Sequence, residues 1–253
     1  LELLYNHDVN YFLIDSTDIG KYTAFSSIGS DEDFDRYSFM SAFLLDESQT
    51  QETNNQTIFV YPGGLGLDED LIIDRDGREI LLPANSAGIG ALITPANNKG
   101  VFEQPRMVIV YQGQQHDVSI RYLHFKGQII DFESGVDAAI YIFPSLEIQG
   151  GQVRVNEQGA ALYLSPRLLR GMLAQVYILG DALGNFPNFK LAHTESSLII
   201  DDLRAQGLEL PEFVYYQGIL GPIKIWEVEY TGREEKKEEY IDRDYRPYID
   251  WRL

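Results

Sequence analysis

Cysteine is absent from this chain of 253 residues, so the sequence offers no disulfide, no thiolate nucleophile and no cysteine-ligated zinc. Long hydrophobic runs are also missing: the longest, such as Met107–Tyr111 and Ala138–Phe143, fall far short of the ~18–20 apolar residues that a membrane-spanning helix needs. Positive charge is scarce, because 20 Lys and Arg face 39 Asp and Glu, which gives a net charge of −19. Such an acidic surface repels phosphate groups, so we expect no nucleic-acid partner.

The rest of the composition is that of a folded protein. Hydrophobic residues make up 44% of the chain and aromatic residues 12%, which is more of both than an acidic disordered chain contains. The length suits one large or two modest domains. The chain begins at Leu1 without a targeting sequence, and we expect it to be a piece of a longer protein.

Two helices are predicted near the start of the chain. The apolar run Tyr11–Ile14 predicts a strand, and the capping side chains of Asp15–Thr17 predict the start of a helix that ends at Gly29. Apolar residues then recur every three to four positions over residues 33–45, which predicts a second helix. Residues 46–56 lack any apolar period and are expected to form a loop.

The middle third of the chain is predicted to be rich in strands. Thr57–Tyr61 is strand-like, and we expect this strand to end at Pro62-Gly63-Gly64. The dipeptide Asp76-Gly77 predicts a tight hairpin over residues 71–82. Further short strands are predicted at Arg106–Tyr111, Val118–Phe125, Gln128–Phe132, Ala138–Phe143 and Gly151–Val155.

The last third combines helix and strand signals. Ser165 followed by Pro166 is a strong helix start, and an apolar stripe at helical spacing continues to Gly180. After it we predict a strand at Phe189–His193, a helix at Leu198–Ala205, a strand at Ile223–Tyr230 and a solvated charge run at Arg233–Glu239.

The expected fold class is therefore α+β. A helical core with C-terminal strands would comprise residues 1–56 and 156–232. A β-rich insert would occupy residues 57–155, and residues 233–253 would form a charged tail.

No catalytic or metal-binding motif stands out in the sequence. The acidic segments Asp31–Asp35 and Asp68–Asp76 could supply oxygen ligands to Ca²⁺, but neither has the spacing of an EF-hand loop, and a helix N-terminus and a hairpin turn are the structural alternatives. The four histidines are scattered without a zinc-binding pair. No two of the 39 acidic residues stand out as a glycosidase pair. We therefore assign no catalytic residue and no metal ligand.

The sharpest local pattern lies in the first predicted helix. Asp18 and Lys21 are three residues apart and Phe25 lies four residues further, which places an acid, an ammonium group and an aromatic ring on one helix face. The alternative is an exposed ion pair that contributes about 0.2–0.5 kcal/mol, with Phe25 in the core.

Asp18 and Lys21 directly follow the first predicted strand, and this arrangement resembles the DK motif of archaeal oligosaccharyltransferase catalytic subunits of the AglB type. The segment Ala161–Gly180 is similar to that family again, and so are Asn188–His193 and Gly221–Val228. These matches follow the order of the family and lie toward both ends of the chain, whereas the β-rich middle is only generically alike.

The resemblance implies a function in protein N-glycosylation. These membrane enzymes transfer a lipid-linked oligosaccharide to the Asn of Asn-x-Ser/Thr, the sequon, and their extracytoplasmic C-terminal domain helps to hold the acceptor. The chain would be that domain, tethered to the cell membrane by an upstream transmembrane region. The resemblance implies that Asp18 and Lys21 lie near the pocket for the Ser or Thr of the sequon, with Phe25 beside them. The implied partners are an acceptor protein or peptide and, through the membrane region, the lipid-linked oligosaccharide.

One family motif is missing. The sequence Trp-Trp-Asp-Tyr-Gly, which binds the Ser or Thr of the sequon in the family, does not occur, since the only tryptophans are Trp226 and Trp251. In the family it precedes the DK motif, as do the membrane spans that carry the metal and the catalytic acids. We therefore expect that this chain is not catalytic alone, and that a divalent metal, Mn²⁺ or Mg²⁺, belongs to the intact enzyme.

Two other functions stay open at this point. The 16 Tyr and the β-rich middle are compatible with a non-enzymatic extracellular module that binds carbohydrate or cell envelope. An acid-pair hydrolase would require the isolated chain to turn over a glycoside. Asn55-Gln56-Thr57 is itself a sequon in an expected loop, which suits an exported protein.

Overall fold

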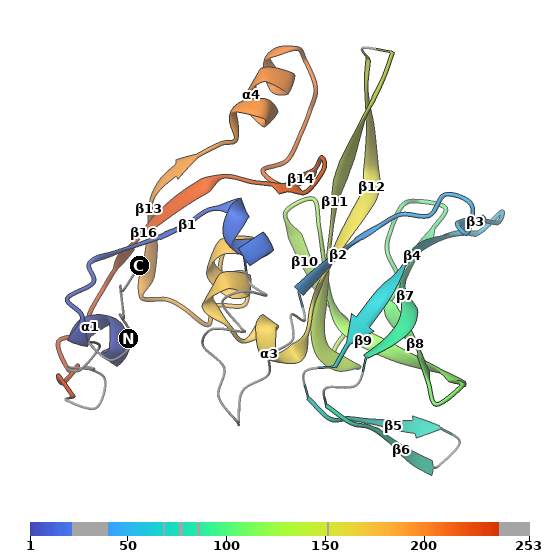
Figure 1. The fold of residues 1–253 in the computed structure, drawn as a ribbon, viewed down its shortest axis with the longest axis horizontal. Coiled ribbons are helices and arrows are strands. Elements are labelled where there is room, and N and C mark those ends of the chain that lie inside the picture. Colours follow the sequence, from blue (N-terminus) through green and yellow to red (C-terminus); the bar gives the residue numbers. More distant parts are fainter. Residues whose placement is uncertain (22–39, 68, 76–77, 85–86, 151, 238–253) are drawn as a thin grey trace, which may run out of the picture.

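A computed structural model describes residues 1–21, 40–67, 69–75, 78–84, 87–150 and 152–237. Strands make up 50% of the structure and helices only 14%, in five short pieces. Figure 1 shows these helices as small elements beside large sheets. The expected α+β fold with a helical core is therefore wrong, because the fold is mostly β.

An eleven-stranded sheet forms the body of the molecule, and all but two of its pairings are antiparallel. The order along the sheet is β15-β14-β11-β9-β8-β7-β4-β3, with β10 beside β9, β12 beside β11 and β2 beside β12. The strands are β2 (Met40–Leu44), β3 (Gln51–Glu52), β4 (Gln56–Gly66), β7 (Ala87–Asn97), β8 (Arg106–Tyr111), β9 (Gln114–Phe125), β10 (Gln128–Asp131), β11 (Val136–Gln149), β12 (Gln152–Leu164), β14 (Val214–Tyr215) and β15 (Ile219–Leu220).

The apolar run of β11 is buried on both faces of the sheet. Ala139, Tyr141 and Phe143 belong to one hydrophobic cluster, whereas the alternate residues Ala138 and Ile140 belong to a second. Successive side chains of a strand point to opposite faces, so a strand that reads as continuously apolar can separate two cores. The neighbouring strand β12 also contributes alternate residues to the two clusters. It runs across residues 155 and 156, where we expected the boundary between the insert and the core.

A smaller antiparallel sheet joins the two ends of the chain. It has the order β1-β16-β13, formed by Tyr11–Ile14, Ile223–Val228 and Phe189–Glu195. All three strands were predicted from the sequence, but their pairing was not. Figure 1 shows this sheet beside the large one, near the chain start.

The hairpin predicted over residues 71–82 is confirmed by β5 (Leu71–Arg75) and β6 (Arg78–Leu82), which pair antiparallel. The expected end of the preceding strand at Pro62-Gly63-Gly64 is wrong, because β4 continues through these residues to Gly66. The expected loop at residues 46–56 contains the two-residue strand β3.

The helices are α1 (Glu2–Asn6), residues 16–21, α3 (Pro166–Leu169), the π-helix η1 (Leu173–Ile178) and α4 (Leu198–Ala205). The predicted start at Ser165 and the helix at α4 are confirmed. The single helix expected over residues 165–180 is instead two short helices, interrupted near Gly171. None of the helices in the described ranges has the length and apolar character of a membrane span.

The second helix expected at residues 33–45 is wrong in its described part. Met40–Leu44 forms β2, and residues 33–39 lie outside the described ranges. Met40 and Phe43 are buried, and β2 pairs with the end of β12. The hydrogen bonds of the sheet and this burial outweigh the helical spacing of the apolar residues.

Candidate functional site

Residues 16–21 form a helix that is capped by Asp15. The Asp15 carboxylate accepts hydrogen bonds from the Thr17 backbone N–H at 2.6 Å and from the Thr17 hydroxyl at 2.5 Å. In return, the Asp15 backbone N–H donates to the Asp18 carboxylate at 3.1 Å. This reciprocal pattern is a capping box, and the Thr17 hydroxyl is the main reason that the pKa of Asp15 lies below its ordinary value.

Lys21 and Asp18 form an ion pair on the surface of this helix, with 3.4 Å between the ammonium group and the carboxylate. The side chain of Lys21 is 52% exposed and that of Asp18 is 25% exposed. A pair this accessible contributes at most about 0.5 kcal/mol to stability. Its groups therefore remain available to a ligand. Phe25, the third predicted site residue, lies outside the described residues.

Segments that are distant in the sequence meet beside this helix. β1 leads into Asp15 and pairs with β16, which in turn pairs with β13. Ile14 and Ile19 pack in one hydrophobic cluster with Trp226 of β16 and with residues of β12, α3 and η1. Ser16 lies close to Tyr177 of η1. The helix thus shares a hydrophobic cluster with the segments 161–180 and 221–228, and Phe189 of β13 packs against the same cluster.

A buried polar cluster lies next to this anchor. The side chain of Lys224 is only 7% exposed, and its ammonium group is 2.8 Å from the Glu212 carboxylate. The same ammonium group donates to the Tyr177 carbonyl at 3.3 Å, and the Tyr177 hydroxyl donates to the Pro222 carbonyl at 2.7 Å. Burial, followed by the nearby Asp15 carboxylate, raises the pKa of Tyr177. Lys224 therefore ties β16 to η1 and to the segment before β14.

A pocket of about 1020 Å³ opens between the sheet and the loop that follows α4. Its walls come from the end of β9, from β11 and β12, from the end of η1 and from residues 204–212. Lys126 at the pocket pairs with Glu157 at 2.8 Å. Arg204 donates two hydrogen bonds to the Leu210 carbonyl, at 3.0 and 2.9 Å, and so supports the loop. Both cations therefore help to hold the walls of the pocket in place.

His124 is the buried imidazole of this pocket, with 7% of its surface exposed. Its ring meets the Tyr141 ring edge-on, with 4.4 Å between the ring centres. Nδ1 has no hydrogen-bond partner within the described part of the chain. Burial lowers the pKa of His124 to about 4, so the ring is neutral at pH 7. A general acid or base works best with a pKa near the operating pH, which this imidazole does not have.

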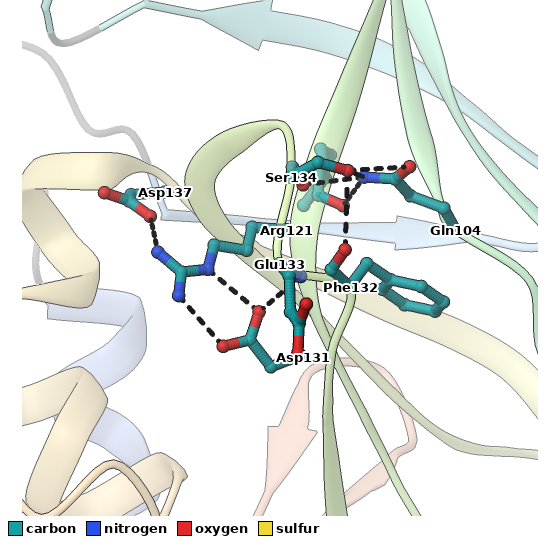
Figure 2. Close-up of polar contacts among 8 residues, drawn as sticks. Gln104, Arg121, Asp131, Phe132, Glu133, Ser134 and Asp137 are labelled. Atoms are coloured by element: carbon teal, nitrogen blue, oxygen red, sulfur yellow. Dashed lines mark hydrogen bonds and ion pairs between the residues drawn. The ribbon is translucent and has the colours of Figure 1, made fainter.

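Arg121 of β9 is held between two carboxylates, as Figure 2 shows. Its Nε and Nη2 donate to Asp131 at 2.8 and 2.9 Å, and its Nη1 donates to Asp137 at 2.8 Å. The hydrogen bonds from Arg121 are the main reason that the pKa of Asp131 is lowered. Beside them, Gln104 donates to the Ser134 carbonyl at 2.7 Å. Because Asp131 and Asp137 belong to β10 and β11, this network fastens three strands and leaves the guanidinium little capacity for a ligand.

No cluster of three or more potential metal-ligating side chains occurs in the ranges that the structure describes. The acidic segment at residues 31–35 lies outside those ranges, as do Asp68 and Asp76. Asp70, which precedes the hairpin, accepts a hydrogen bond from the Ala84 backbone N–H at 2.7 Å. A calcium site at these segments therefore stays one of the alternatives that the sequence leaves open.

Comparisons with protein-family models, with curated proteins and with solved structures find nothing that matches this chain.

Sequence reasoning located the exposed pair of Asp18 and Lys21 but missed the pocket and the buried ion pair. Lys224 lies in an apolar stretch and Glu212 follows a Pro, and no spacing relates the two residues. His124 and Tyr141 come from two strands that are neighbours only through parallel pairing. No local signal in the sequence could have joined either pair.

Proposed function

We propose that this chain is the extracytoplasmic acceptor-recognition domain of a membrane oligosaccharyltransferase, an enzyme that transfers a lipid-linked oligosaccharide to the Asn of Asn-x-Ser/Thr. The observation that carries the proposal is the position of the segments that resemble this family. Residues 15–21, 161–180, 188–193 and 221–228 are scattered along the chain, yet they pack around one hydrophobic cluster. Ile19 of the helix and Trp226 of β16 are buried members of this cluster, the segment 161–180 supplies several more, and Phe189 of β13 packs against it.

Asp18 and Lys21 would hold the acceptor peptide. The Lys21 ammonium group has three donors on a mobile stem, which suits a peptide carbonyl or the hydroxyl of the sequon Ser or Thr. Asp18 orients this group through the 3.4 Å ion pair. Phe25 would lie beside them. The chain supplies no catalytic acid in this proposal, and the divalent cation, Mn²⁺ or Mg²⁺, belongs to the membrane region of the enzyme.

Substitution of Lys21 in the intact enzyme tests the proposal. Lys21→Ala should raise the KM for a sequon peptide by a factor of about 10 to 150, because a hydrogen bond from a charged group contributes about 1.5–3 kcal/mol to binding. The free energy of unfolding should change by less than about 0.5 kcal/mol, since the side chain is exposed. Steady-state transfer to sequon peptides and urea denaturation measure the two quantities.

Lys236→Ala is the matched control. Lys236 is 49% exposed and also pairs with a carboxylate, that of Asp8 at 2.8 Å. It lies outside the proposed site, so its replacement should leave the KM unchanged. An unchanged KM in Lys21→Ala as well would contradict the proposed role.

The alternative of a carbohydrate-binding module receives little support from the pocket. Sugars stack on exposed aromatic faces, but Tyr141 is only 5% exposed and Phe143 only 2% exposed. Phe125, the other aromatic ring of the pocket, has the Lys126 ammonium group 5.4 Å from its centre. We therefore do not propose that function.

A further inference from the structure

The sequon of this chain lies at a surface turn. Asn55-Gln56-Thr57 is the only Asn-x-Ser/Thr triplet in the sequence, and its middle residue is not Pro. Asn55 is exposed and sits in the turn that joins β3 to β4. Its backbone carbonyl accepts a hydrogen bond from the Asn98 N–H at 3.0 Å, and the residue is exposed to solvent.

The Asn55 side chain makes no hydrogen bond to the rest of the described protein. Neighbouring side chains do: Thr53 donates to the Gln56 carbonyl at 2.9 Å, and Gln56 donates to Glu103 at 2.8 Å. A large group on the Asn55 amide nitrogen would therefore displace no contact and enter no core. We infer that Asn55 is an N-glycosylation acceptor, modified by an oligosaccharyltransferase with a polyprenyl-phosphate-linked oligosaccharide as donor.

The chemistry balances with that donor. The Asn55 amide nitrogen forms a bond to C1 of the first sugar and loses one proton to a base of the transferring enzyme. The bond between C1 and the phosphate oxygen breaks, and the lipid phosphate leaves with the electron pair. No oxidant or reductant is involved. The inference rests on the proposed function in one respect, since it requires the extracytoplasmic location.

The timing of the modification follows from the position of Thr57. Thr57 is part of β4 and is paired with Glu52 of β3 and Ala96 of β7. A transferring enzyme must hold the Thr and the Asn together, so at least β3 has to detach from the folded chain. β3 has only two residues, and short edge elements open more readily than central strands. Transfer should therefore be fastest before β4 has paired.

A glycan at this turn would also have a structural consequence. β3 is the last strand in the order of the large sheet. The edge of a sheet is a template for pairing with another chain, and bulky polar groups beside it oppose that association. A glycan on Asn55 would shield this edge.

Mass spectrometry of the full-length protein, isolated from the cells that make it, tests the inference. The proteolytic peptide with Asn55 should carry a glycan mass. Thr57→Ala should abolish this mass, and Thr57→Ser should retain it, because the hydroxyl is the recognised group. Asn98 is the internal control: it is exposed beside Asn55 but is followed by Lys99-Gly100, so its peptide should be unmodified.

Unmodified Asn55 in the wild-type protein would overturn the inference, and so would a glycan that persists in Thr57→Ala. The proposed function is tested by a separate measurement, the acceptor KM of Lys21→Ala, so the two proposals can fail independently. If Asn55 is unmodified while Lys21→Ala still raises the acceptor KM, only the present inference is wrong. If Asn55 carries a glycan while Lys21→Ala leaves the KM unchanged, only the acceptor role of Lys21 is wrong.

Discussion

At the scale of single residues, burial decides the charge of His124. The imidazole is neutral at pH 7 because its surroundings in the pocket lower its pKa from 6.5 to about 4. In the unfolded chain the pKa of His124 would lie near its ordinary value of 6.5. Between pH 6.5 and about pH 4 the unfolded chain therefore binds a proton that the folded chain does not bind. Stability contributed by the neutral ring is therefore complete above pH 6.5 and is lost as the pH falls toward 4.

We expect His124→Phe to remove this dependence. The Phe ring keeps the edge-on contact with Tyr141 and deletes an Nδ1 that has no hydrogen-bond partner in the described structure. Relative to the variant, the wild-type protein should lose about 2 kcal/mol of unfolding free energy between pH 7.5 and about pH 5. Urea denaturation at the two pH values measures this difference.

His193→Gln serves as the control, since the His193 side chain is 57% exposed. It should follow the wild-type pH dependence. Equal pH dependence in His124→Phe and the wild type would show that the buried imidazole does not control acid stability.

At the scale of elements, glycines let neighbouring strands of the large sheet approach closely. A Cβ atom on Gly90 of β7 would lie 2.0 Å from the Val108 carbonyl oxygen of β8, and one on Gly63 of β4 would lie 2.4 Å from the Phe43 ring. Gly63 and Gly90 are partners in the β4–β7 ladder. We expected Gly63 to help end the strand. Instead it lets β4 continue, because it has no side chain that would clash with the Phe43 ring.

Gly90→Ala should lower the free energy of unfolding by about 2–3 kcal/mol, because the backbone of β8 has to move away from the added methyl group. Gly64→Ala is the matched control, since Gly64 lies in the partner strand with no atom within 4 Å of an added Cβ. That control should be within about 0.5 kcal/mol of the wild type. Similar losses in the two variants, measured by urea denaturation, would contradict the close approach of β7 and β8.

At the scale of the whole molecule, the net charge of −19 opposes compaction. The ion pairs that offset it are mostly exposed, as those of Lys126 and Arg154 show with side chains 62% and 61% accessible. Exposed pairs contribute little individually. Repulsion among the excess carboxylates is therefore the main long-range electrostatic term in stability.

Salt should stabilise the protein at neutral pH. Raising the ionic strength from about 0.01 M to about 0.15 M shortens the Debye length from about 30 Å to about 8 Å and screens the repulsion. We expect the Tm to rise by about 2–4 °C, equivalent to about 1 kcal/mol for a chain of this size. Near the pI of about 4.5 the same change should have little effect. A Tm that falls with salt at pH 7 would show that the ion pairs outweigh the repulsion.

The part of the candidate site that could be predicted is local in the sequence. Asp18 and Lys21 share a helix face because their spacing dictates it, and a capping residue before them could be expected from Asp15. The ion pair of Lys224 and Glu212 could not, since the two residues meet only through the packing of β16 against η1 and the segment before β14. The predicted acceptor role of Asp18 and Lys21 remains a proposal until the KM is measured.

Several elements carry their own signal in neighbouring residues: the strand Tyr11–Ile14, the hairpin over residues 71–82 and the helix Leu198–Ala205. A short apolar run, a turn dipeptide and helical spacing are properties of a few adjacent residues, so no tertiary information was needed for them. Met40–Leu44 shows the opposite case. Its apolar spacing also fits a helix, and only pairing with the distant strand β12 makes it a strand. Because sheet hydrogen bonds join residues that are far apart in the chain, tertiary structure alone decided that this fold is mostly β.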